Sequence, residues 1–225
     1  LIDSITITVD EIAIEDANQF PFRVVNGGRI LIQNSLNISS KSTDKVFIPK
    51  IINLANTINL ANAHYIVNST TSNSNSYNLQ NATLSFEGDA FFANSISGDS
   101  DSIIDLQNAY SLTVEDITGN LTIICGNSVK TNLYVSKSSF FSQLIVYNNT
   151  DFFALNCTIG KVTVSPTIQE SSIISFNLYD SYVFIEQANL SNCQITSINS
   201  ELKSSDFNLR NFIFENHQKI IESPN

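Results

Sequence analysis

Three copies of one short motif do most to constrain the fold of this chain. Gln33-Asn34-Ser35, Gln80-Asn81-Ala82 and Gln107-Asn108-Ala109 each stand between two stretches in which apolar and polar residues alternate. Alternation with a period of two is typical of a β-strand with one buried face. Asn tolerates the left-handed backbone conformation and favours tight corners. The motif therefore predicts a unit of strand, corner and strand, with Asn34, Asn81 and Asn108 as structural corner residues.

A unit that recurs along a chain predicts a solenoid, because each repeat hides its apolar face only by stacking on the next. If two coils separate Asn34 from Asn81, each coil has about 23 residues, and the interval to Asn108 is similar. Over 225 residues this spacing predicts a single β-helix domain, residues 1–225, of about nine coils. At the usual distance between paired strands, nine coils form a rod roughly 40–45 Å long.

The composition favours a folded protein and disfavours several partners. The chain is 42% hydrophobic, and only 14% of its residues are charged, with 29 Asn among the polar ones. A net charge of −10 with 11 scattered Lys and Arg excludes a clustered basic face, so we expect no nucleic acid partner. No run of eighteen apolar residues occurs, so we expect no membrane insertion by a helix.

The two ends of the chain suggest continuation. The chain begins with Leu1, contains no Met and ends abruptly at Asn225, as a processed product or a segment of a longer chain would. We see no amphipathic helix in the first or last twenty residues that would cap a solenoid. Because the ends of a β-helix expose unpaired strand edges, we expect further repeats or end-to-end self-association.

One stretch allows a helical alternative. Ile52-Asn53-Leu54-Ala55-Asn56 recurs at once as Ile58-Asn59-Leu60-Ala61-Asn62. A helix would place apolar residues on one face, but so would two short strands with an Asn corner, and Asn is a poor helix former. We favour the strands. The polar runs 70–76 and 97–102 are interpreted as loops.

The frame from Ile104 to Val114, in which apolar residues alternate on both sides of Asn108-Ala109, resembles the right-handed parallel β-helix, or pectin-lyase-like, superfamily. The Asn- and Ser-rich composition is most similar to that of its large surface proteins. The resemblance covers most of the chain as a pattern and implies a coiled parallel sheet with three faces and ladders of corner asparagines. The superfamily contains enzymes, adhesins and non-catalytic surface proteins, so the fold alone does not decide the function.

The catalytic elements of such enzymes are largely missing. Asn149-Thr150-Asp151 matches one polygalacturonase element, but the sequence contains no Asp-Asp, Gly-His-Gly or Arg-Ile-Lys element to accompany it. The pairs Asp99 with Asp101 and Glu87 with Asp89 lack the spacing of a calcium loop. None of the arginines Arg23, Arg29 and Arg210 lies in a carboxylate-rich frame, as a lyase would need. We therefore expect no catalytic residues, no metal site and no cofactor.

The histidines and cysteines suggest no chemistry. His64 and His217 are far apart and stand beside no nucleophile motif, so we interpret them as polar surface residues; a triad assembled through space stays open. Cys125, Cys157 and Cys193 are too dispersed for a metal or redox motif. We interpret them as small buried hydrophobes, and one internal disulfide among them stays open.

Two further features concern the surface. The doublets Phe91-Phe92, Phe140-Phe141 and Phe152-Phe153 either place one ring inward and one outward or bury both at a corner, and we favour core or corner packing. Outward rings could bind a glycan or a protein. Seven Asn-x-Ser/Thr sequons are candidates for N-glycosylation if the source is a secreting eukaryote: Asn37, Asn68, Asn81, Asn120, Asn148, Asn156 and Asn189.

These observations together predict a non-enzymatic extracellular or cell-surface β-helix. It would be a structural or adhesive segment, or a filament subunit, with N-linked glycans. The alternative is a polysaccharide-active lyase or hydrolase, or a carbohydrate-binding β-helix that uses its aromatic residues.

Overall fold

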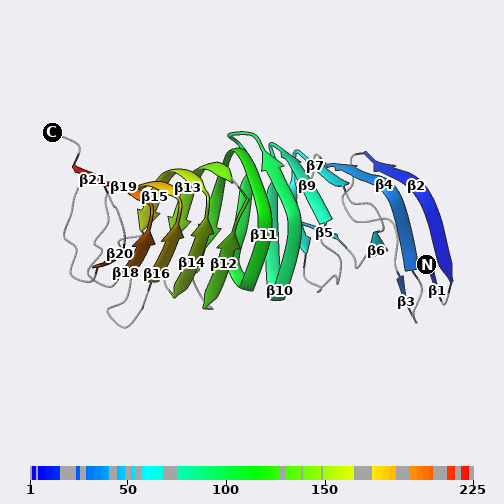
Figure 1. Cartoon of the computed structure of the whole chain (residues 1–225). Helices are drawn as coiled ribbons and strands as arrows, with labels where there is room; N and C mark the ends of the chain where they lie inside the picture. Colours follow the sequence, from blue (N-terminus) through cyan, green and yellow to red (C-terminus); the bar gives the residue numbers. More distant parts are fainter. Residues whose placement is uncertain are drawn as a thin grey trace.

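The chain folds into a stack of parallel strands that runs along one axis, from β2 at one end to β21 at the other (Figure 1). The computed structural model describes residues 2–3, 5–15, 24–25, 29–40, 45–48, 52–53, 57–67, 75–126, 130–137, 139–147, 149–164, 174–185, 193–204, 212–215 and 219–222. All the secondary structure assigned within these ranges is strand or turn, and no helix occurs among them.

The strands differ in length, and the two longest, β10 and β11, lie in the middle of the stack. They are β1 (Ile2–Asp3), β2 (Thr6–Ile14), β3 (Val24–Val25), β4 (Arg29–Ser39), β5 (Val46–Ile48), β6 (Ile52–Asn53), β7 (Thr57–Ala61), β8 (His64–Val67), β9 (Asn75–Gln80), β10 (Thr83–Gly98), β11 (Ile103–Cys125), β12 (Thr131–Val135), β13 (Phe140–Val146), β14 (Thr150–Leu155), β15 (Thr158–Val164), β16 (Ile174–Tyr179), β17 (Tyr182–Ile185), β18 (Cys193–Ile198), β19 (Glu201–Ser204), β20 (Phe212–Glu215) and β21 (Lys219–Glu222).

The pairing of these strands defines a parallel β-solenoid. One column of parallel pairs, here called the main column, runs through eleven strands: β2, β4, β7, β9, β10, β11, β13, β15, β17, β19 and β21. A second column passes from β10 through β11, β12, β14, β16, β18 and β20. The all-β parallel solenoid predicted from the sequence is therefore confirmed, and it agrees with a right-handed β-helix.

The number of coils differs slightly from the nine predicted, because most coils are shorter than 23 residues. Ile58 pairs with Tyr77 and Leu133 with Phe152, and each partner lies nineteen positions further along the chain. The main column of eleven strands is about 48 Å long at the usual spacing of paired strands.

The core lies inside the coils and consists of alternate residues of each strand. In β11 the buried side chains are Ile104, Leu106, Ala109, Leu112, Val114, Ile117, Leu121, Ile123 and Cys125. Their spacing is two within straight segments and three or four where the strand bends, because a bend must skip a position to keep the apolar face inward. Buried residues of one coil face buried residues of the next through the strand register, as Leu84 does Ile104.

The corners depend on left-handed polar residues. Asn81, with a φ of 47°, separates β9 from β10 as a corner residue. Asn34 and Asn108 instead lie inside β4 and β11, next to points where the pairing shifts register by one residue. The chain bends at these two asparagines while the strand continues. Among the described residues, the other left-handed ones with a side chain are Asn62, Lys137, Asn149, Asn156, Asp180 and Asn199.

The repeat at 52–62 forms strands, as we favoured over a helix. Ile52–Asn53 is β6 and Thr57–Ala61 is β7, in which Ile58 and Leu60 are buried and Asn62 follows as a left-handed residue. The predicted corner Asn56 lies outside the described residues. The predicted loop at 97–102 is shorter than expected, since Ser97 and Gly98 still belong to β10. Of the other predicted loop, Asn75 and Ser76 belong to β9, and residues 70–74 lie outside the described residues.

The phenylalanine doublets point alternately inward and outward. Phe91, Phe141 and Phe152 are buried, whereas Phe92 and Phe140 are 60% and 44% exposed. The favoured prediction that the core or a corner packs both rings is therefore wrong for the first two doublets, because both lie in extended strands rather than at corners. Cys125 and Cys157 are buried and free, as predicted for small hydrophobes. The side chain of Cys193 is outside the described residues.

Candidate functional site

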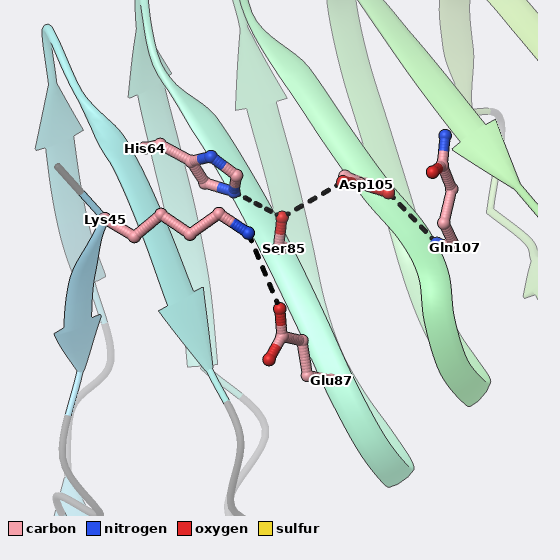
Figure 2. Close-up of polar contacts among 6 residues, drawn as sticks. All are labelled: Lys45, His64, Ser85, Glu87, Asp105 and Gln107. Atoms are coloured by element: carbon pink, nitrogen blue, oxygen red, sulfur yellow. Dashed lines mark hydrogen bonds and ion pairs between the residues drawn. The ribbon is translucent and has the colours of Figure 1, made fainter. Parts of the chain in front are cut away.

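A cluster of polar side chains from three successive coils forms the strongest candidate for chemistry (Figure 2). His64 begins β8, Ser85 lies in β10 and Asp105 in β11. The Nε2 of His64 is 2.6 Å from the Oγ of Ser85, and that oxygen is 3.3 Å from Oδ2 of Asp105. Parallel pairing sets this arrangement, since Ser85 is the register partner of Asp105 and His64 pairs with Thr83, two positions before Ser85.

The neighbouring residues partly shield this cluster from solvent. Ser85 is only 3% exposed although it stands on the outer face, because its polar neighbours cover it. The other oxygen of Asp105 accepts the backbone N–H of Gln107 at 3.0 Å, and Lys45 forms an ion pair with Glu87 at 3.9 Å. Burial lowers the pKa of His64, and Lys45 lowers it further, while Asp105 and Glu87 act in the opposite direction.

The order of hydrogen bonds does not favour a nucleophilic serine. A hydroxyl group has one proton, and Ser85 donates it to Asp105. In this arrangement the Nε2 of His64 contacts the Ser85 oxygen as the tautomer that carries the ring proton on Nε2. In a catalytic triad the histidine stands between serine and carboxylate and removes the serine proton. Here the serine stands in the middle, and the cluster is suited to linking three coils.

Spacing along the chain could have revealed this cluster. His64, Ser85 and Asp105 follow one another at intervals of about one coil. The sequence motifs predict His64 as a polar surface residue, and neither Ser85 nor Asp105 belongs to one of them. A coil length near twenty residues would have superimposed all three positions on one face.

A second polar array, which we call the amide ladder, runs along the outside of the main column. Ser97 donates to Oδ1 of Asn78 at 2.6 Å, Asn78 donates to Oδ1 of Asn59 at 2.7 Å, and Asn59 donates to Oδ1 of Asn37 at 2.5 Å. The amide of Asn37 donates in turn to the carboxylate of Glu11. All these donors point toward the N-terminal end of the stack, so the ladder has one direction and ends at an anion. A groove of about 370 Å³ lies along the same strands and includes Asn37, Asn59 and Asn78 in its lining.

Buried hydroxyl groups form a third array at one set of corners. The Oγ of Ser181 accepts the backbone N–H of Cys157 at 3.1 Å, and the Oγ of Ser200 accepts that of Ser181 at 3.0 Å. Each of these two serines also donates to the carbonyl two residues before it. A left-handed residue lies between each serine and the carbonyl it contacts: Asp180 precedes Ser181, and Asn199 precedes Ser200. Asn156 precedes Cys157 in the same way. This recurrent triplet of apolar residue, Asn or Asp, and Ser or Cys was missed by the sequence analysis.

The residues considered for catalysis or calcium have structural contacts. Asn149 has a φ of 52°, Thr150 is buried, and Asp151 forms an ion pair with Lys130 at 2.6 Å. Asp99 accepts the backbone N–H of Asn81 and the hydroxyl of Ser102, and the Ser102 hydrogen bond is the main reason that the pKa of Asp99 is lowered. His217 and the side chain of Asp89 lie outside the described residues. Among the side chains that are described, no three or more His, Cys, Asp and Glu converge on a possible metal position.

The sequons differ in their surroundings. The amide of Asn37 is engaged in the amide ladder, and that of Asn81 donates to Asn62 at 3.4 Å. Asn120 and Asn156 are exposed, and the Oδ1 of Asn120 accepts from Ser142 at 3.4 Å. Asn68, Asn148 and Asn189 lie outside the described residues.

Aromatic rings line part of the second column on its outer face. The ring centroids of Tyr134 and Phe153 are 6.0 Å apart, and those of Phe153 and Tyr179 are 5.1 Å apart. Tyr134 is 44% exposed, Phe153 and Tyr179 are half-buried, and Leu155 beside them is exposed. We call these three rings the aromatic stripe.

Comparison of the chain with protein-family models, curated proteins and solved structures found no significant match. The pectin-lyase-like superfamily and the surface-protein type therefore stay predictions, while the parallel solenoid rests on the strand pairing. The part of the chain that the structure describes includes no helix that is long and apolar enough to cross a membrane.

Proposed function

We propose that this chain is a non-enzymatic, extracellular β-solenoid that acts as a structural rod. The observation that carries the proposal is that the polar side chains form hydrogen bonds between coils. The amide ladder, the buried hydroxyl groups and the cluster around Ser85 all connect one coil to the next. Groups held in this way stabilise a long, narrow core, because each hydrogen bond joins two coils.

The cluster around Ser85 supports this proposal over a hydrolase. An activated nucleophile needs a base that takes its proton and an orienting group behind that base. Ser85 instead donates toward Asp105, and only a small fraction of its surface reaches solvent. An approaching substrate would have to displace His64 or Asp105 before it met the hydroxyl.

Activity-based labelling tests the absence of catalysis. We expect a fluorophosphonate probe to leave Ser85 of the native protein unlabelled. Pectin and alginate should also stay intact, with or without Ca²⁺. Labelling of Ser85 that disappears in His64→Gln would overturn the proposal, because it would show that His64 activates the hydroxyl. Solution scattering from the same sample should show an elongated particle, as expected for a rod.

The aromatic stripe supports a second candidate, an adhesive rod that binds carbohydrate. Aromatic rings on an open face offer apolar surface with a polar rim, and Asp151 and Lys130 lie beside Tyr134 on the same column. We expect Phe153→Ala to abolish any binding detected on a glycan array. Phe47→Ala, at an exposed ring on β5, is the matched control. Binding that survives Phe153→Ala would remove the stripe from consideration.

The exposure of the sequons predicts which asparagines carry glycans when the chain is secreted. If the chain is expressed in a secreting eukaryotic cell, we expect glycans at the exposed Asn120 and Asn156 in preference to Asn37. The amide nitrogen of Asn37 would have to leave Glu11 to be modified. Site-resolved glycopeptide masses measure this, and occupancy at Asn37 with none at the two exposed sites would contradict it.

A further inference from the structure

An exposed phenylalanine extends the row of rings on the second column beyond the aromatic stripe. Phe92 of β10 is 60% exposed, and its register partner in β11 is Thr113. Thr113 pairs in turn with Tyr134 of β12, and Tyr134 pairs with Phe153 of β14. Register partners of neighbouring parallel strands lie side by side on the same face of a sheet. The column therefore carries a row of rings along the rod, with a gap of one coil at Thr113.

The rings of the aromatic stripe do not stack face to face. The ring planes of Tyr134 and Phe153 are tilted by 42°, and those of Phe153 and Tyr179 by 34°. Tyr134 is 44% exposed, and Phe153 and Tyr179 are half-buried. Each ring therefore keeps apolar surface that a ligand can contact.

The apolar surface of this row is narrow. Asn132 and Asp151 precede Tyr134 and Phe153 by two positions, so a polar column runs along one side of the rings. On the other side, Leu155 and its register partner Tyr179 widen the row at one end. A stable interface with a folded protein takes about 20–30 residues a side. A row of this width is suited instead to a chain of ring-sized units.

The charges beside the row are paired with one another. Lys130 forms an ion pair with Asp151 at 2.6 Å, and Lys137 forms one with Glu115, which lies two positions after Thr113. The chain as a whole has a net charge of −10, which repels an acidic polymer. These charges favour a neutral ligand. A neutral sugar has an apolar C–H face that suits an aromatic ring and hydroxyl groups that suit the polar column beside it.

We propose that Phe92, Tyr134, Phe153 and Tyr179 bind one linear, neutral polysaccharide chain that runs along the rod. A sugar ring in such a chain is about as long as the distance between two coils, so successive sugars meet successive coils. The row extends over five successive strands of the second column, β10, β11, β12, β14 and β16 (Figure 1). This ligand class rests on the adhesive function proposed above and specifies it.

Titration calorimetry with linear oligosaccharides of two to six units tests this site. The probes are neutral oligomers of glucose, mannose, xylose and N-acetylglucosamine, with oligogalacturonates of the same lengths as the acidic comparison. We expect the affinity for at least one neutral series to rise with chain length up to about five units, one for each strand of the row. The oligogalacturonates should bind more weakly, because they carry the same sign of charge as the protein.

Two substitutions test the ends of the row and its gap. Phe92→Ala should weaken binding of the longest oligomers by roughly three- to tenfold and leave the shortest unchanged. Thr113→Tyr fills the gap and should tighten binding of the longest oligomers by a similar factor. Phe140→Ala is the matched control, because Phe140 is 44% exposed like Tyr134 but lies on β13 of the main column. Circular dichroism should show the same β-content for all variants.

Three results would overturn the inference. Affinity that does not depend on chain length, or that neither Phe92→Ala nor Thr113→Tyr alters, would confine the contact to the aromatic stripe and leave the adhesive function intact. Tighter binding of oligogalacturonate would contradict the neutral class of ligand. Failure of every series to bind the wild-type protein would remove the adhesive function as well, whereas the structural rod would still stand.

Discussion

Asn59 donates its side-chain amide to the Oδ1 of Asn37, which lies one coil earlier, at 2.5 Å. Asn59 also accepts from Asn78 of the following coil. One side chain thus connects three coils, and its two hydrogen bonds run in the same direction along the rod.

Removing the middle of the amide ladder should destabilise the protein moderately. In Asn59→Ala, Asn37 loses a donor and Asn78 loses an acceptor, although water can reach both because the ladder is partly exposed. We expect a loss of about 1 kcal/mol in the free energy of unfolding, measured by urea denaturation. Asn120→Ala, at an exposed Asn outside the ladder, should change it by less than about 0.5 kcal/mol. Equal effects of the two substitutions would show that the ladder adds nothing.

Substitution of Ser181 should destabilise the protein more than substitution of Asn59, because the hydroxyl group of Ser181 is buried. Ser181→Ala leaves the backbone N–H of Cys157 without its acceptor and should cost about 1–3 kcal/mol. Ser181→Cys should recover part of this loss, since Cys157 occupies the equivalent place one coil earlier and its thiol contacts the carbonyl of Leu155 in the same way. The free energy of unfolding of both variants measures this, and a cysteine variant no better than alanine would contradict it.

The corner at Asp180 tests the need for a left-handed residue. Asp180 has a φ of 48° and is exposed, so a substitution there changes the backbone preference with little effect on packing. We expect Asp180→Val to lower the free energy of unfolding by about 1–2 kcal/mol, because a β-branched residue disfavours this conformation. Asp180→Gly should be close to neutral. A valine variant as stable as the glycine variant would show that the corner relaxes to another conformation.

The His64 cluster should make folding stability depend on pH. Burial and Lys45 lower the pKa of His64 from its ordinary value of 6.5, so below that pH the unfolded chain binds a proton more readily than the folded one. Stability is therefore lost as the pH falls through about 6.5. His64→Gln should reduce the difference in unfolding free energy between neutral pH and about pH 5. Parallel pH profiles for wild type and variant would refute the role of His64.

Much of the fold could be predicted from local pattern. The alternation in the Ile104–Val114 frame places Ile104, Leu106, Leu112 and Val114 in the core, and all four are buried. The left-handed corner at Asn81 also follows from residue type. The coil length did not follow as well, because Asn34 and Asn108 mark bends within strands and Asn81 marks a break between them. Because the three asparagines occupy different positions within their coils, the spacing between them overestimates the coil length.

That error explains why the candidate site was missed. His64, Ser85 and Asp105 meet only if coils are about twenty residues long, and a repeat of 23 places them on different parts of the rod. The orientation of the phenylalanine doublets also depended on where the coils bend. Phe92 and Phe140 lie in strands, and a corner position would have allowed their rings to be packed.

The sequence by itself determined that short strands with one apolar face would alternate with polar corners, because side-chain period and backbone preference are local properties. Only the tertiary structure decided which polar side chains meet across coils. Contacts such as Asn59 with Asn37 join residues 22 positions apart. Their register depends on single-residue shifts such as the one between Ser85 and Glu87, which no local pattern specifies.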